Sequence, residues 1–63
     1  METLLLVEAD ERLRSFWEPT FQKEGFETVA VYSFEQALEA AQRDPPALVF
    51  LGSGFDGTAG VSL

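Results

Sequence analysis

The 63-residue chain contains neither cysteine nor histidine. These absences exclude a disulfide framework, a Cys/His zinc site and any Ser–His or Cys–His catalytic pair. Lysine and arginine number four against eleven acidic residues, and the net charge of −7 is the wrong sign for binding nucleic-acid phosphates. No apolar run approaches the roughly 18 residues of a membrane span, and no basic segment opens the chain as in a signal peptide. We therefore expect a cytoplasmic protein without nucleic-acid or membrane partners.

What the chain does have is apolar and aromatic content. Hydrophobic residues make up 46% of it, including six Phe, one Trp and one Tyr, which is typical of a folded protein rather than a disordered one. A chain of this size buries only about 60% of the surface that its unfolded form exposes. The composition thus predicts one small domain over residues 1–63, with self-association as the way to enlarge its core.

Three strand patterns alternate with two helix patterns along the chain. Thr3–Val7 and Ala47–Leu51 are apolar without polar alternation, as in strands that are covered on both faces. The expected strands cover about 3–7, 27–32 and 47–51, and the expected helices about 10–24 and 34–43. The order β-α-β-α-β with short connections predicts an α/β fold with a parallel sheet and helices on both faces.

The first helix pattern carries both of its end signals. Asp10 is suited to the N-cap, Gly25 to the left-handed residue after the last turn, and Pro19 predicts a bend between them. The apolar residues recur at helical spacing and are expected to face the core: Leu13, Phe16, Trp17 and Phe21. The second helix pattern begins with Ser33 and Gln36 at the spacing of a capping box.

Four segments together resemble the receiver domain of response regulators, the phosphoacceptor module of two-component signalling. They are Leu4–Arg12, Glu24–Val29, Ser33–Leu38 and Pro46–Leu51, with Gly57 and Gly60 where the family's next loop carries glycines. The resemblance implies a truncated flavodoxin-like fold with strand order 2-1-3. It covers the N-terminal half of a receiver, which has five strands and five helices, so the family's switch Thr or Ser and its lysine have no counterpart here.

The resemblance also shows which family chemistry is missing. Receivers hold Mg²⁺ between two acidic residues after strand one and the acceptor Asp after strand three, and that carboxylate takes the phosphoryl group. Here Glu8 keeps the first acidic position, Ala9 replaces the metal ligand, and Gly52 occupies the acceptor position. We therefore expect a degenerate receiver, a pseudo-receiver, with no catalytic residue, phosphoacceptor, metal site or cofactor.

Two other patterns have structural explanations beside the functional ones. The loop Gly52–Gly57 matches G-x-G-x-x-G after a strand, which is one element of a dinucleotide site, but the following helix, strand and acidic residue are absent. Glu8, Asp10 and Glu11 could be a metal cluster, yet acidic residues at the start of a helix are also favoured by its dipole. A flexible loop and a helix start are the simpler interpretations.

The order 2-1-3 leaves the third strand at an open edge, where unpaired backbone groups favour pairing with another chain. We expect a homodimer in which two copies of this strand pair antiparallel about a two-fold axis, completing the sheet as 2-1-3-3′-1′-2′. The expected interface residues are Ala47, Leu48, Val49, Phe50 and Leu51. The favoured function is a receiver-like protein-interaction module rather than an enzyme. The alternatives are a truncated remnant without function of its own and a small-ligand or nucleotide binder using Gly52–Gly57.

Overall fold

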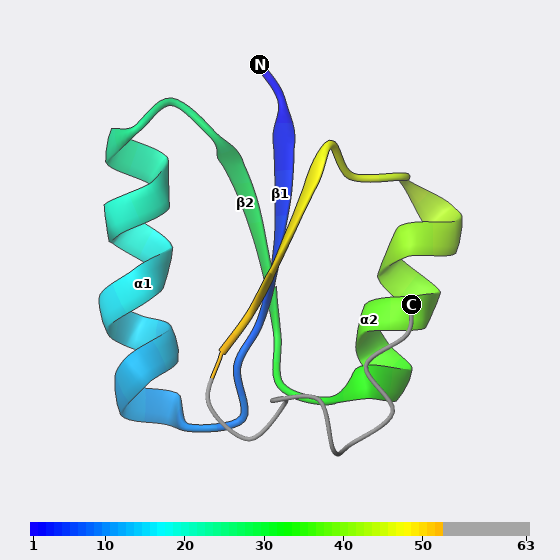
Figure 1. The fold of residues 1–63 in the computed structure, drawn as a ribbon, viewed down its shortest axis with the longest axis horizontal. Helices are drawn as coiled ribbons and strands as arrows, with labels where there is room; N and C mark the ends of the chain where they lie inside the picture. The colour runs from blue at the N-terminus through cyan, green and yellow to red at the C-terminus, as the bar shows by residue number, and fades with distance from the viewer. Residues whose placement is uncertain (53–63) are drawn as a thin grey trace.

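The computed structural model of the chain describes residues 1–52, which form a three-stranded sheet and two helices. The elements are β1 (Thr3–Val7), α1 (Glu11–Lys23), β2 (Glu27–Val31), α2 (Phe34–Arg43) and β3 (Leu48–Leu51). In Figure 1 the strands run side by side between the two helices, and the connections β1–α1 and β2–α2 lie at one end of the molecule. Residues 53–63, which include most of the loop Gly52–Gly57, lie outside the described residues.

The sheet is parallel and has the order β2-β1-β3. Leu5 of β1 lies opposite Val29 of β2 and Val49 of β3, so β1 is paired on both sides. The predicted parallel α/β sheet with order 2-1-3 is therefore confirmed. Within residues 1–52, β2 and β3 are the two outer strands.

The two helices cover opposite faces of the sheet (Figure 1). Trp17 and Phe21 of α1 pack on Phe50 of β3, with ring centroids 5.0 Å apart in both pairs. Ala37 of α2 instead packs with Leu5 and Val7 of β1. Because successive strand residues point to opposite faces, these contacts place α1 on the even-numbered face of β1 and β3 and α2 on the odd-numbered face.

The core of the described residues is small and centred on β1. Four of its strand residues are at most 3% exposed, and Ala37 is the one fully buried apolar residue outside that strand within residues 1–52. β3 contributes only half-buried or exposed residues. One strand therefore holds most of the core, as expected for so small a chain.

Most of the predicted helix signals are confirmed, with small shifts at element ends. Asp10 caps α1 through its side chain, and Gly25 has the positive φ, +98°, predicted for the residue after the helix. Ser33 caps α2 by accepting from Gln36 N, 3.1 Å away. The reciprocal bond of a capping box is replaced, because Gln36 Oε1 accepts from Tyr32 N at 3.0 Å. That bond holds Tyr32 outside β2, which ends at Val31 rather than at residue 32.

Two expectations for α1 need correction or refinement. Phe16 was expected to face the core, but its ring is 59% exposed and meets the edge of the Trp17 ring at 5.1 Å. The helix presents Trp17 and Phe21 to the sheet, and Phe16 lies 100° around the axis from Trp17. Pro19, where we predict a bend, lies inside α1, and the helix continues for another turn beyond it. Beside it, Thr20 Oγ1 donates to Phe16 O at 2.8 Å.

Candidate functional site

The carboxyl ends of β1 and β3 meet at the edge of the sheet where a receiver would have its acidic residues. Gly52 N donates to Val7 O at 2.8 Å, and Glu8 N donates to Val31 O at 3.0 Å. The first bond places Gly52 beside the end of β1 and so beside Glu8, which is 44 residues away in the sequence, and the second bond joins Glu8 to β2. The first candidate site is therefore this strand-end pair.

Glu8 is completely buried. Its carboxylate Oε2 accepts from Asp10 N at 3.0 Å, and its backbone oxygen accepts from Arg14 Nη1 at 2.9 Å. The Arg14 guanidinium also lies over the Tyr32 ring, 5.6 Å from its centroid. The carboxyl group of Glu8 is thus buried and accepts a bond from the backbone of the turn that follows β1, as buried polar groups require.

The Glu8 carboxylate occupies the space that a side chain at position 52 would need. A Cβ added to Gly52 would overlap Glu8 Oε1 and would lie 2.6 Å from Glu8 Cδ. Gly52 does not have a positive φ, so its backbone conformation is open to other residues. A side chain at position 52 would therefore require the Glu8 carboxyl group to move. The pair offers no nucleophile where the receiver family has its acceptor.

The remaining acidic residues near this edge do not complete a metal site. Asp10 Oδ1 accepts from Arg12 N at 2.8 Å and from Leu13 N at 3.4 Å, which is helix capping. Ala9, at the position of the family's metal ligand, is exposed and has no ligand atom. Across residues 1–52 no group of three acidic side chains is arranged to hold a metal ion.

The second candidate site is the open edge of β3. Leu48 is 47% exposed and Val49 is 41% exposed, while Phe50 and Leu51 are half-buried. None of these side chains is charged. Ala47 is also exposed, but it precedes the strand and its N–H donates to Thr3 O at 2.9 Å. The five residues expected at the interface thus form an uncharged strip along one edge of the molecule.

The backbone of β3 has hydrogen-bonding groups directed away from the sheet. Gly52 N donates to β1, and successive residues of a strand direct their backbone groups to alternate sides. Phe50 therefore faces β1 with its backbone groups, whereas Val49 and Leu51 turn theirs to the open side. Each of these two residues offers one N–H and one C=O to an incoming strand.

The opposite edge of the sheet, at β2, is better protected. Glu27 at the start of β2 is exposed and charged, and Tyr32 N just beyond its end is bonded to the Gln36 side chain. Charges and side-chain caps of this kind discourage strand addition. Of the two outer strands, β3 is therefore the one whose edge suits pairing with another chain.

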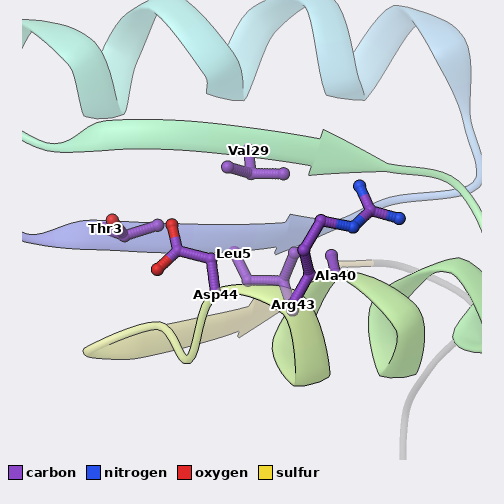
Figure 2. A pocket seen from close by; sticks show the side chains of 6 residues that line it. All are labelled: Thr3, Leu5, Val29, Ala40, Arg43 and Asp44. Atoms are coloured by element: carbon purple, nitrogen blue, oxygen red, sulfur yellow. The ribbon is translucent and has the colours of Figure 1, made fainter.

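A third candidate is a hollow of about 200 Å³ between α2 and the sheet (Figure 2). Leu5 and Val29 form its apolar floor, Ala40 forms a wall, and Thr3, Arg43 and Asp44 line the rim. Ligand sites are usually about 300–1,000 Å³ and have several polar groups that point at one spot. This hollow is smaller, and its opposite charges, Arg43 and Asp44, are adjacent residues at the end of α2.

The sequence pattern pointed to the exposed edge of β3 but missed two features. One is the packing of the Glu8 carboxylate over Gly52, whose only signal is an acidic residue and a glycine directly after two adjacent buried strands. The other is the exposure of Leu13 and Phe16 on α1, which are 38% and 59% exposed. Helical spacing places both on the apolar side of α1 without specifying how that side is turned toward the sheet.

Comparisons with protein-family models, with curated proteins and with solved structures found no match to this chain. None of the helices in the described part is long and apolar enough to cross a membrane. The resemblance to receivers therefore depends on the sequence motifs alone.

Proposed function

We propose that this chain is a receiver-like protein-interaction module of the two-component type that does not accept a phosphoryl group. It binds through the open edge of β3, and its partner is a second copy of the same chain. The observation that carries the proposal is the uncharged, exposed edge with the outward backbone groups of Val49 and Leu51. A second strand would bond to those groups and cover the apolar side chains at once.

The strand-end pair supports the loss of phosphoryl transfer. A receiver needs a carboxylate at position 52 and a metal ligand at position 9, and the chain has glycine and alanine there. An acceptor side chain at position 52 would fit only if the Glu8 carboxyl group moved. What remains of the receiver pattern is three strands of its sheet and two of its helices.

The small core supports association with a second copy. Within residues 1–52 the fully buried apolar residues are those of β1 and Ala37, and the α2 face of β3 is left exposed at Val49. Pairing two β3 edges would extend the sheet to six strands and bury apolar surface on both faces. Symmetric dimers are the most common oligomers of soluble proteins.

Replacing Val49 with lysine tests the proposal. We expect V49K to reduce the native mass, measured by light scattering on a sizing column, from that of a dimer to that of a monomer. The reason is that pairing of the two β3 strands would bury each lysine charge among apolar side chains without a partner of opposite charge. Far-ultraviolet circular dichroism establishes that the variant keeps its helices and strands.

L38K is the matched control, because Leu38 is also 41% exposed but lies on α2, away from the edge. The control is expected to keep the dimer mass. A folded V49K protein with the same mass as L38K would show that the β3 edge is not the binding surface.

A further inference from the structure

The structure specifies which residues meet if two copies pair through β3. We propose that the two-fold axis passes beside Phe50, so that Phe50 faces its own counterpart and α1 of each copy lies beside α1 of the other. This inference rests on the proposed function and adds to it a strand register and a second contact surface.

The register follows from the outward backbone groups. Val49 and Leu51 turn one N–H and one C=O each toward the open side, and the N–H of Ala47 is already bonded to Thr3 O. In an antiparallel pair, two opposed residues exchange both of their backbone bonds. Placing Val49 opposite Leu51 of the second copy uses all of the outward groups of both residues. Placing Val49 opposite itself would instead set Leu51 against Ala47, whose N–H is not free.

In this register Phe50 and its counterpart form the pair without backbone bonds between them. Such residues have their Cα atoms about 4.5 Å apart and their side chains in contact. Phe50 already packs on Trp17 at 5.0 Å, and Trp17 stacks on Phe21 at 5.7 Å. The two copies would therefore join their aromatic clusters into one layer beneath the α1 helices.

The exposed side of α1 is turned toward this seam. Trp17 reaches Phe50 of β3, whereas Arg14 reaches Tyr32 beyond β2, and these two contacts define the two sides of the helix. At 100° per residue Leu13 lies within 40° of Trp17, on the β3 side. Phe16 lies next to Trp17, on the side of the helix away from Arg14. We call Leu13, Phe16 and Trp17 the α1 flank.

The width of the seam suits these side chains. In the paired sheet the two β1 strands are three strand spacings apart, about 14 Å. Each α1 has its backbone neighbours in its own β2 and β1 and none in β3, so the two helices would lie at least as far apart as the two β1 strands, beyond the 8–10 Å of close helix packing. Large side chains are needed to fill that gap, and Phe16, which is 59% exposed, extends from the flank.

The distribution of charged residues favours a second copy of the chain as the partner at the β3 edge. The chain carries a net charge of −7, so self-association requires a surface without acidic groups. The α1 flank and residues 47–51 contain no charged residue. The two-fold also sets the α1 helices antiparallel, so that Glu11 in the first turn of one helix is near the end of the other that carries Lys23. Antiparallel helices also align their dipoles favourably.

Single-cysteine variants test the register, since the chain has no cysteine of its own. Under mild oxidation we expect F50C to form a disulfide-linked dimer about tenfold faster or more than L38C, because facing thiols react at high effective concentration. A Cα separation of about 4.5 Å lies within the range of roughly 4.4–6.8 Å that disulfides span. V49C alone is expected to react no faster than L38C.

The double variant V49C/L51C keeps the aromatic cluster and provides a second test if F50C does not fold. In the proposed register each cysteine faces the other position of the second copy, and rapid cross-linking is expected. Fast cross-linking of V49C alone in a dimeric protein would overturn the register. If all variants react slowly while the native mass is that of a dimer, the β3 seam is wrong. A monomeric native mass at every concentration would instead overturn the proposed function itself.

Discussion

At the scale of single residues, the most informative feature is the burial of the Glu8 carboxylate against Gly52. The two residues follow the adjacent strands β1 and β3, and the space beside Gly52 Cα is filled by the Glu8 side chain. The Glu8 carboxylate is completely buried and accepts a bond from Asp10 N. Because a side chain at position 52 would overlap the Glu8 carboxyl group, we expect the two positions to behave as a coupled pair.

A double-mutant cycle measures that coupling. G52A is expected to lower the free energy of unfolding by about 1–3 kcal/mol, because its methyl group must displace a buried, bonded carboxylate. The Glu8→Ala change removes that carboxylate and should restore part of the loss in the G52A background. Urea unfolding of the four proteins gives the interaction energy, expected to exceed about 0.5 kcal/mol. Additive effects would show that the Glu8 carboxylate yields to a methyl group without cost.

The sequence identifies Glu8 and Gly52 as strand-end residues, but it does not show that the Glu8 side chain packs against Gly52. Their positions after two apolar segments mark them as strand-end residues, and the resemblance to receivers marks the missing acceptor. Which way the Glu8 side chain turns depends on the register of β1 with β3 and on the Asp10 N–H, and neither is encoded in local spacing. Long-range contacts of this kind are visible only in three dimensions.

At the scale of elements, the two outer strands differ in how well their edges are protected against pairing with another strand. β2 begins at the charged Glu27, and the backbone N–H that follows it is bonded to Gln36 of α2. β3 has neither a charge nor a side-chain cap along its residues, and Ala47 before it is apolar as well. Strand propensity and apolar runs predicted both strands to within one residue. β2 ends one residue early, where the Gln36 side chain accepts from Tyr32 N, and β3 begins one residue late, after Ala47.

The start of α2 is one such side-chain contact and can be tested separately. Ser33→Ala removes the oxygen that accepts from Gln36 N and should cost about 1 kcal/mol of stability. For a domain of this size that loss corresponds to a drop in melting temperature of roughly 4–8 °C. Thermal unfolding followed by circular dichroism at one fixed protein concentration is the appropriate measurement, since dimer stability depends on concentration.

Ser33→Asp is the matched control, because aspartate supplies an acceptor oxygen at the same place. It should retain most of the wild-type stability. Equal melting temperatures for S33A and the wild type would show that the Ser33 cap does not stabilise α2.

At the scale of the whole molecule, the features that the sequence predicts are set within short segments, whereas those that it does not predict depend on contacts between residues far apart in the chain. The element order, the parallel sheet and the helix caps follow from periodicity and end signals within short segments. The rotation of α1, which exposes Phe16 and turns Leu13 toward the β3 side, follows from packing of Trp17 and Phe21 on Phe50 some 30 residues away. A helical pattern alone shows which residues share a side, but not which neighbour that side meets.

The small core is concentrated on the central strand of the parallel sheet. β1 is buried by its two neighbours and by both helices, while β3 is covered on one face by α1 and is open at its edge. Pairing of two β3 edges would remove the open edge and extend the core across the axis. Under the proposal, the same β3–β3 contact would provide both the binding of a second copy and part of the stability of the fold.

The most direct test is the native mass of the wild-type chain, measured by light scattering on a sizing column over a series of protein concentrations. At roughly 0.15 M salt, where repulsion between the acidic copies is screened beyond about 8 Å, we predict a particle of twice the chain's 7.0 kDa. Its mass should fall toward 7.0 kDa only on strong dilution. A particle of 7.0 kDa at every concentration, unfolding cooperatively on heating, would contradict the proposal that this chain works through its β3 edge as a dimer.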